Sequence, residues 1–214
     1  MLRAHLLCLL LLSPIFAAGE DWISLFNGKD LTGWQPNENP ETWLVEDGAI
    51  VAHGGRSHCY YMGPVLNHNF RNFELTVDVK AKHNSNGGVY ILTRYEPKGW
   101  PQYGFEVQVN NTYDTDPRKT GSLYEVQDVA QQLVPDDTWF TEHITVRGDT
   151  ITVRVNGKQV VQWKQPDDWI GTSDFPGRRI QAGTIALQRH DASSTVYYRN
   201  IRFRALPDAQ PARR

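Results

Sequence analysis

The sequence predicts an all-β protein, a jelly-roll sandwich of two stacked antiparallel sheets. Three observations predict this class: apolar and polar residues alternate strictly in several segments, turn dipeptides separate these segments, and no sustained helical period follows residue 20. Aromatic residues make up 11% of the chain, with 7 Trp, 9 Tyr and 8 Phe. Such a content suits a sheet-built core or a surface on which flat ligands stack.

Strands are expected wherever the side chains alternate with a period of two. Residues 73–80 (FELTVDVK) show the pattern most clearly, because every second residue is apolar and the others are polar. Similar segments predict strands at residues 42–46, 49–53, 88–94, 103–109, 139–147, 151–155, 158–163, 183–190 and 195–204.

Turn signals join these segments and leave several long loops. Asp47-Gly48, Asn156-Gly157 and Gly148-Asp149 each stand between two β-like segments and favour tight hairpins. Residues 122–132 are the best helical candidate, for no more than a turn or two. The stretches expected to be irregular are 54–68, 95–102, 110–122 and 164–181. The last is too long for a plain hairpin loop, and long ordered loops of β domains often build a site.

Residues 1–19 are expected to be a secretory signal peptide, with a retained anchor as the alternative. Arg3 gives a positive start, residues 6–12 (LLCLLLL) form an apolar run, and residues 16–19 (FAAG) offer a small-residue cleavage site. A membrane helix needs about 20 apolar residues, which this run does not reach. We therefore expect a secreted or periplasmic protein, off the membrane after cleavage, with one domain over 20–206 and a flexible tail over 207–214.

Composition excludes several other classes of protein. Lys and Arg number 22 against 24 Asp and Glu, so no basic excess indicates a nucleic-acid partner. The 2 Cys residues rule out a disulfide framework and a Cys-based zinc cluster. Several histidines are scattered without the spacing of metal ligands, so no metal site is predicted.

Candidate chemistry lies on the faces of predicted strands, since the sequence has no compact catalytic motif. The polar residues that share a strand face are Glu106, Gln108 and Asn110; Gln188 and His190; and Arg94, on the face of Tyr90 and Leu92. A solvated sheet face is also polar, which is the simpler explanation of each residue alone. As a set, however, a carboxylate, carboxamides, an imidazole and a guanidinium suit the vicinal hydroxyls of a sugar.

Several motifs follow one another in a fixed order along the chain. They are LFNGKDLTGW at residues 25–34, Trp43 with Asp47-Gly48, NGGV at 86–89 leading to Arg94, GFEVQV at 104–109, TGSLY at 120–124, VNG at 155–157, IALQRH at 185–190 and YRNI at 198–201. Together they resemble the 3-keto-disaccharide hydrolase domain family of exported bacterial proteins, over about residues 22–206.

The resemblance implies a concanavalin A-like jelly roll whose concave face receives a sugar. It also implies cleavage of glycosides whose C3 hydroxyl has been oxidised to a ketone, and a glycoside 3-dehydrogenase upstream that makes this ketone. Members of the family often carry an acid directly after the Glu-x-Gln strand, where this chain has Asn110-Asn111. Either the acid is displaced into the loop, as Asp114 or Asp116, or this chain lacks it.

The residues distinguish between two cleavage chemistries. A retaining glucanase needs two carboxylates about 5 Å apart. The strand face expected to carry the site has one acid, Glu106, and two amides, Gln108 and Asn110. A 3-keto-glycoside requires one base to remove the acidified C2 proton, a stabiliser for the enolate, and amides that position the sugar. The C1 substituent then leaves by β-elimination, and water adds to the unsaturated sugar.

The site roles follow from these requirements. We expect His190 to be the base, because an unperturbed imidazole has a pKa of about 6.5. Glu106 is the alternative base, with His190 then returning a proton to the leaving oxygen, and the sequence does not order the two. Arg94 is expected to stabilise the enolate. The residues expected to position the sugar or stack on it are Gln108, Gln188, Tyr124, Asn110, Trp100 and Trp169.

The expected partner is a small carbohydrate, and no organic cofactor is expected. Asp114 and Asp116 could contribute ligands to a structural Ca²⁺, which concanavalin-like domains sometimes hold. The alternative function is a non-catalytic, lectin-like carbohydrate-binding domain with the same groove. A third class is an interaction domain of a larger envelope complex.

Overall fold

The computed structural model describes residues 21–208 and confirms the all-β class. The strands are β1 (Ile23–Ser24), β2 (Trp34–Pro36), β3 (Trp43–Glu46), β4 (Ala49–Ala52), β5 (Ser57–Tyr61), β6 (Phe73–Ala81), β7 (Asn86–Thr93), β8 (Phe105–Asn110), β9 (Phe140–Arg147), β10 (Thr150–Val155), β11 (Lys158–Lys164), β12 (Thr184–Arg189) and β13 (Val196–Ala205). Two short 3-10 helices are η1 (Pro40–Thr42) and η2 (Val65–His68). In this part of the chain, no helix is long and apolar enough to cross a membrane. The expected signal peptide and most of the expected tail lie outside the described residues.

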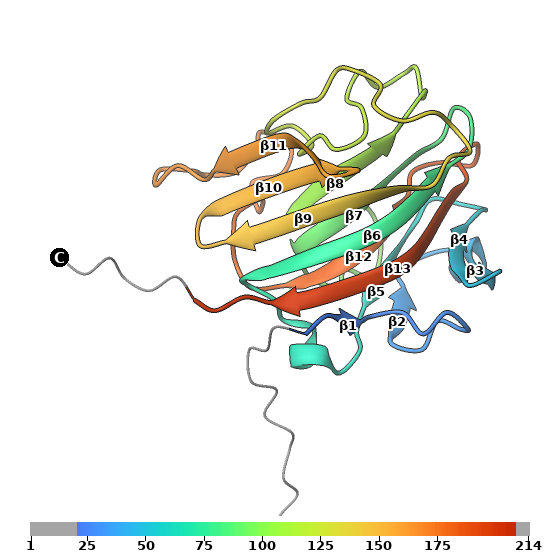
Figure 1. The fold of residues 1–214 in the computed structure, drawn as a ribbon, viewed down its shortest axis with the longest axis horizontal. Coiled ribbons are helices and arrows are strands. Elements are labelled where there is room, and N and C mark those ends of the chain that lie inside the picture. The colour runs from blue at the N-terminus through green and yellow to red at the C-terminus, as the bar shows by residue number, and fades with distance from the viewer. Residues whose placement is uncertain (1–20, 209–214) are drawn as a thin grey trace, which may run out of the picture.

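Two antiparallel sheets form the layers of the sandwich (Figure 1). The larger sheet has the order β11-β10-β9-β6-β13-β4-β3, with β1 paired to β13. The smaller sheet has the order β2-β5-β12-β7-β8. In each sheet a strand from the C-terminal part of the chain lies between earlier strands: β13 lies between β6 and β4, and β12 lies between β5 and β7, as in a jelly roll.

The three turn dipeptides form the hairpins that the sequence predicts. Asp47 and Gly48 have φ values of 48° and 73° between β3 and β4. Asn156 and Gly157 have φ values of 48° and 81° between β10 and β11. Positive φ at both central residues matches the twist of the flanking strands, and Asn, Asp and Gly adopt it most readily. Gly148, with φ 61°, likewise joins β9 to β10.

Alternation along the strands places one apolar row between the sheets. In β6, Phe73, Leu75, Val77 and Val79 are fully buried, whereas the residues between them are half-buried. The smaller sheet contributes to the same core Val89, Ile91, Phe105, Val107, Val109, Ile185 and Leu187. A slip of one residue would move such a row to solvent, so the core fixes the register of both sheets.

One segment expected to be irregular contains a strand, and the segment that was the best helical candidate contains no helix. Residues 54–68 contain strand β5, all five residues of which are buried. A strand covered on both faces shows no alternation, and the polar Ser57 and His58 hide it further. Residues 122–132 contain no helix; instead, Leu123 and Gln127 exchange two backbone hydrogen bonds of 3.0 and 2.9 Å across a tight turn.

Glu142 occupies a core position of β9, between Phe140 and Ile144 in the alternation. It is fully buried, and within the described part of the chain neither carboxylate oxygen has a hydrogen-bond partner. Burial, and to a smaller extent the charge of Glu106, raise the pKa of Glu142 well above its ordinary value. The folded chain therefore retains a proton there that the unfolded chain releases, so Glu142 costs stability as the pH rises through the ordinary carboxyl pKa.

Replacing Glu142 with Leu should therefore stabilise the fold. We expect the free energy of unfolding to rise by about 1–3 kcal/mol at about pH 8, and by less at about pH 4, where the unfolded chain also keeps the proton. Denaturant unfolding at both pH values measures the difference, with the exposed Glu46→Leu as the control. An equal gain at both pH values would contradict a titrating core acid.

Candidate functional site

The open face of the smaller sheet carries polar side chains in rows that run across the strands. One row, across β5, β12, β7 and β8, consists of Tyr60, Ala186, Tyr90 and Glu106. The next row consists of His58, Gln188, Gly88 and Gln108. Because alternate residues of these strands fill the core, the polar set is forced onto the opposite face.

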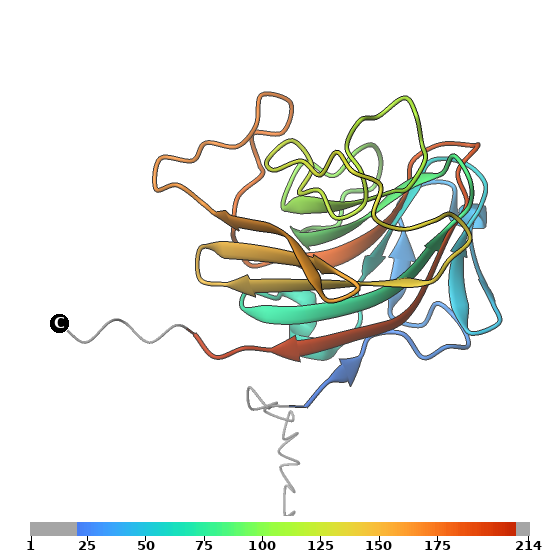
Figure 2. The same cartoon turned by 45° about the horizontal axis from the view of Figure 1, so that its top comes forward.

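Loops close this face into a cavity of about 250 Å³. Figure 2 shows the yellow-green segment between β8 and β9 and the orange segment between β11 and β12 on the same side of the molecule. The lining residues are Asn86, Tyr90, Trp100, Glu106, Gln108, Tyr124, Glu125, Asp174, Phe175, Gln188 and His190. The cavity therefore brings together both candidates for the base.

Glu106 is held in a hydrogen-bonded network and is only 4% exposed. Tyr90 Oη donates to Glu106 Oε2 at 2.8 Å, and Gln188 Nε2 donates to Tyr90 Oη at 3.3 Å. With its amide nitrogen turned toward the carboxylate, Gln108 donates to Glu106 Oε1 at 3.3 Å. Burial raises the pKa of Glu106, while the charge of Arg178 and the Tyr90 hydrogen bond partly oppose the rise.

His190 is paired with the carboxylate of Asp191, which was not among the residues expected at the site. Its Nδ1 lies 2.9 Å from Asp191 Oδ2. Burial acts to raise the pKa of Asp191, but hydrogen bonds from Ser193 and His190 outweigh it and hold the pKa below the usual carboxyl range. A carboxylate on Nδ1 favours the tautomer that leaves Nε2 as a proton acceptor. The adjacency of His190 and Asp191 in the sequence was the available signal.

A second histidine lies next to this pair but stays neutral. His58 on β5 is fully buried, with its ring 5.5 Å from the rings of Tyr90 and Trp100. Burial, then the charges of Arg56 and His190, lower the pKa of His58 to about 3. His58 therefore supports the floor of the site as an uncharged ring.

Arg178, and not the expected Arg94, places a positive charge beside the cavity. Its guanidinium lies 4.1 Å from the Phe175 ring centroid and 5.3 Å from that of Tyr124, directly behind the cavity wall. Nη1 donates to the Tyr124 carbonyl, while within residues 21–208 Nε and Nη2 have no hydrogen-bond partner. The side chain is 1% exposed, so its charge is weakly screened and acts on Glu106.

The expectation that Arg94 lies in the same cavity as Glu106 and His190 is wrong. Arg94 stacks on Tyr103 at 3.3 Å and lines a separate cavity with His68 and Tyr95. Strand β7 changes face before it reaches Arg94, because Leu92 adopts a φ of 57° and packs in the core. This breaks the period of two on which the expectation depended.

Glycines make room for this change of face. A Cβ on Gly104 would lie 2.6 Å from the Leu92 carbonyl carbon, and a Cβ on Gly183 would lie 2.5 Å from it. Any side chain at either position would therefore collide with the bulged backbone of β7.

Asn110 also lies outside the cavity lining, although it shares the strand face of Glu106. Its Nδ2 donates to the carbonyls of Asp116 and Arg118 at 3.0 and 2.8 Å. Asn110 thus braces the loop after β8 instead of lining the cavity. Asp116, the displaced acid considered from the sequence, accepts from the Arg118 backbone N–H at 2.8 Å and does not line the cavity.

Two other carboxylates do line the cavity, Glu125 and Asp174. Glu125 has a φ of 59°, in the left-handed region, and its Oε2 accepts a hydrogen bond from Thr172 at 3.2 Å. Such strain in a non-glycine residue is common where a side chain is aimed at a site. The expectation of a single acid at the site is therefore incomplete.

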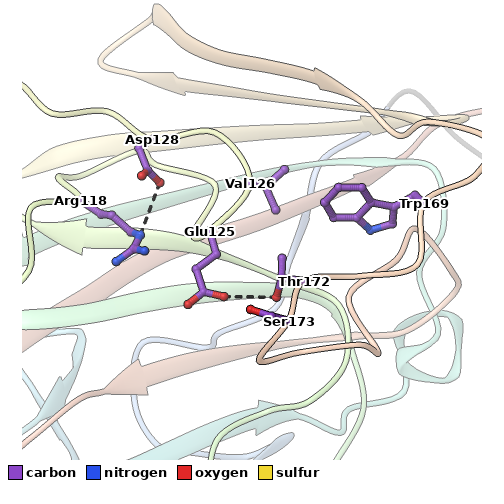
Figure 3. Close-up of a pocket in the computed structure, with 7 residues that line it drawn as sticks. All are labelled: Arg118, Glu125, Val126, Asp128, Trp169, Thr172 and Ser173. Carbon is purple, nitrogen blue, oxygen red and sulfur yellow. Dashed lines mark hydrogen bonds and ion pairs between the residues drawn. The ribbon is translucent and has the colours of Figure 1, made fainter.

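The aromatic candidates divide between two cavities. Trp100 and Tyr124 line the first, where the Trp100 ring lies 5.0 Å from that of His190. Burial raises the pKa of Tyr124 to about 12, so its hydroxyl can donate a hydrogen bond at neutral pH. Trp169 instead lines a neighbouring cavity of about 580 Å³ (Figure 3). Among the described residues, no group of three or more His, Cys, Asp or Glu is arranged to hold a metal ion.

Comparison with known proteins agrees with this architecture. Residues 21–204 match the family model of the 3-keto-α-glucoside-1,2-lyase-like domain. The chain belongs to this family. A curated relative, the 3-keto-disaccharide hydrolase of Bacteroides thetaiotaomicron, is 25% identical, and the alignment covers 90% of this chain and 80% of the relative.

Solved structures of other proteins share the fold of this chain. A protein from Parabacteroides distasonis, described as a candidate glycosyl hydrolase, matches with a TM-score of 0.73 and 26% identity over 87% of this chain and 94% of its own. A carbohydrate-binding module from Bacillus subtilis matches with a TM-score of 0.58 and 12% identity, covering 81% of this chain and 96% of its own. The second match shows a shared fold alone.

The position of Glu106 depends on the absence of a side chain at Gly88 in this family member. A Cβ there would lie 2.6 Å from Glu106 Oε1, so Gly88→Ala should cost roughly 1–3 kcal/mol of stability and displace the carboxylate. Chemical denaturation of Gly88→Ala, Glu106→Ala and the double variant measures the coupling. The cost should largely disappear in the Glu106→Ala background. An equal cost in both backgrounds would place the clash elsewhere.

Proposed function

We propose that the chain cleaves 3-keto-glycosides by removal of the C2 proton, β-elimination of the C1 substituent and hydration of the resulting enone. The observation that carries the proposal is the arrangement of His190, braced by Asp191, and the buried acid Glu106 around one cavity that also presents carboxamides. The family and the name of the curated relative support a 3-keto-sugar as the substrate.

The reaction balances without an added oxidant or reductant. A base takes the proton from C2, which the C3 ketone acidifies, and the electron pair forms an enolate across C2 and C3. The enolate collapses to a C1–C2 double bond, and the C1 oxygen leaves with a proton from an acid. Water then adds at C1 and a proton returns to C2, so the products are a 3-keto-sugar and an alcohol.

His190 serves as the base in this proposal, because the Asp191 carboxylate at 2.9 Å leaves Nε2 free to accept a proton. Glu106 serves as the acid, because burial raises its pKa and keeps it protonated over a wider pH range than an exposed glutamate. The sequence alone left open which of His190 and Glu106 is the base, and this proposal makes His190 the base and Glu106 the acid. Gln108 and Gln188 bind sugar hydroxyls, since a carboxamide both donates and accepts hydrogen bonds.

Enolate stabilisation is assigned to the Tyr124 hydroxyl and to the field of Arg178. Tyr124 lines the cavity and can donate to a developing negative charge, whereas the Tyr90 hydroxyl already donates to Glu106. Arg178 lies behind Tyr124 and has little contact with water, so its positive charge acts at short range through the cavity wall. Arg178 is therefore a positioning and electrostatic residue.

A second candidate function is direct hydrolysis of an unoxidised glycoside by a pair of carboxylates. The specific observation that favours it is that Glu125 and Asp174 line the same cavity as Glu106. Either could act with Glu106 as an acid–base or acid–nucleophile pair. The chemical requirements of the two functions differ in one respect, since only elimination needs a ketone at C3.

The oxidation state of the substrate separates these functions. We expect the purified protein to cleave 3-keto-glucosides and to leave the unoxidised parent glucosides intact, as followed by mass spectrometry of the released alcohol. Deuterium at C2 should slow the cleavage, since the C2–H bond breaks. Cleavage of the parent would support the carboxylate pair, and binding of both sugars without cleavage would support a lectin-like domain.

The roles of His190 and Glu106 can be separated by the leaving group. On a 3-keto-disaccharide, His190→Ala and Glu106→Gln should each lower kcat/KM by roughly 10²–10⁴. On a 4-nitrophenyl 3-keto-glucoside, which needs no protonation to leave, Glu106→Gln should recover most of its rate and His190→Ala should not. The reverse pattern would exchange the two roles.

The same variants predict a pH dependence. The protonated form of Glu106 acts, so wild-type kcat/KM should fall as the pH rises through the raised pKa of this carboxyl group. Glu106→Gln should lack this alkaline decline when both proteins are assayed on the 3-keto-disaccharide. A decline that persists in Glu106→Gln would assign it to another group.

A further inference from the structure

A second cavity of about 580 Å³ adjoins the first and shares Glu125 with it. It is bounded by the turn after β8 and by the loop between β11 and β12, and Arg118, Asp128, Trp169, Thr172 and Ser173 also line it. Figure 3 shows Arg118 and Asp128 on one side and Trp169 on the other, with Glu125 and Thr172 between them. A ligand that extends past Glu125 would therefore pass from one cavity into the other.

The indole of Trp169 is fixed in place by its neighbours. Its Nε1 donates to the Arg178 carbonyl at 2.6 Å, and its ring lies edge-on to Trp163 with centroids 5.0 Å apart. The polar edge of the ring is thus already occupied, while Trp169 remains half-buried and lines the cavity. An indole held in this way offers a flat apolar surface at a small entropic cost.

The opposite wall offers charged hydrogen-bonding groups. Arg118 Nε lies 3.5 Å from Asp128 Oδ1, and Thr172 Oγ1 donates to Glu125 Oε2 at 3.2 Å. Both donors and acceptors are therefore present along one side, facing an aromatic ring on the other. Apart from Trp169 and Val126 the lining is polar, which suits a hydroxylated ring better than an aromatic one.

Arg178 links the two cavities physically. Its carbonyl holds Trp169, and its guanidinium donates to the Tyr124 carbonyl behind the first cavity. A ligand ring bound against Trp169 would therefore contact the loop between β11 and β12. The same loop carries Arg178, whose positive charge acts on Glu106. Occupancy of the second cavity can in this way support the geometry of the first.

We propose that the second cavity binds the leaving sugar of a 3-keto-disaccharide, with Trp169 stacking on the ring and Glu125, Asp128 and Arg118 contacting its hydroxyls. This inference rests on the proposed function for the identity of the first sugar. It assigns specificity for the leaving group to the segment between β8 and β9 together with the loop between β11 and β12.

The test compares substrates with and without a second ring. Wild type, Trp169→Ala and Asp128→Ala are assayed on 3-keto-maltose and 3-keto-cellobiose, and on the methyl 3-keto-glucosides of both anomers. Both variants should raise KM for the better disaccharide by roughly tenfold and change KM for the methyl glucoside by less than about twofold. Ile170→Ala is the control, because Ile170 is 80% exposed and does not line the cavity. Equal changes on both substrate types, or none, would overturn the proposal.

A binding measurement keeps this test separate from the proposed activity. Calorimetric titration of unoxidised maltose and cellobiose should show roughly tenfold weaker binding of one of them to Trp169→Ala and Asp128→Ala, with Ile170→Ala unchanged. Disaccharide binding that depends on Trp169, in a protein that does not cleave 3-keto-sugars, would keep the second-ring site and reject the elimination chemistry. Binding that is undetectable, or insensitive to both variants, would reject the site.

Discussion

The site depends on the burial of the Glu106 carboxyl group against the backbone of Gly87 and Gly88 in β7. On the core side, a Cβ on Gly87 would lie 2.8 Å from Tyr198 Oη; on the open side, a Cβ on Gly88 would lie 2.6 Å from Glu106 Oε1. The two glycines thus let a polar ring and an acid approach the same strand from both faces. Tyr90 and Gln108 then satisfy the oxygens of an acid that would otherwise be costly to bury.

Where the strands are regular, the sequence predicts both the fold and the contents of the site. The period of two in β8 places Phe105 and Val107 in the core and Glu106 and Gln108 on the open face, as expected. The same holds for Gln188 on β12. These predictions succeed because a sheet with one covered face allows only one orientation of each strand.

Prediction from sequence fails where tertiary contacts change the local geometry. Arg94 leaves the site because β7 bulges at Leu92, and the glycines that permit the bulge, Gly104 and Gly183, lie directly before the neighbouring strands β8 and β12. Asn110 is on the expected face, but nearby loop carbonyls bind its amide. The sequence does not distinguish Arg178 from the other residues of the long loop between β11 and β12. Only the packing of Arg178 against Tyr124 and Phe175 in the folded chain brings it beside the cavity.

The charges around the cavity favour a neutral substrate whose charge develops during the reaction. Glu125 and Asp174 line it, with Asp191 next to His190, so an anionic sugar would meet like charges. A ketone is uncharged on entry and becomes an enolate only after C2 is deprotonated. In the proposed reaction, the Tyr124 hydroxyl and the field of Arg178 act mainly on the charged stage, and stabilisation confined to that stage increases kcat more than it increases ground-state affinity.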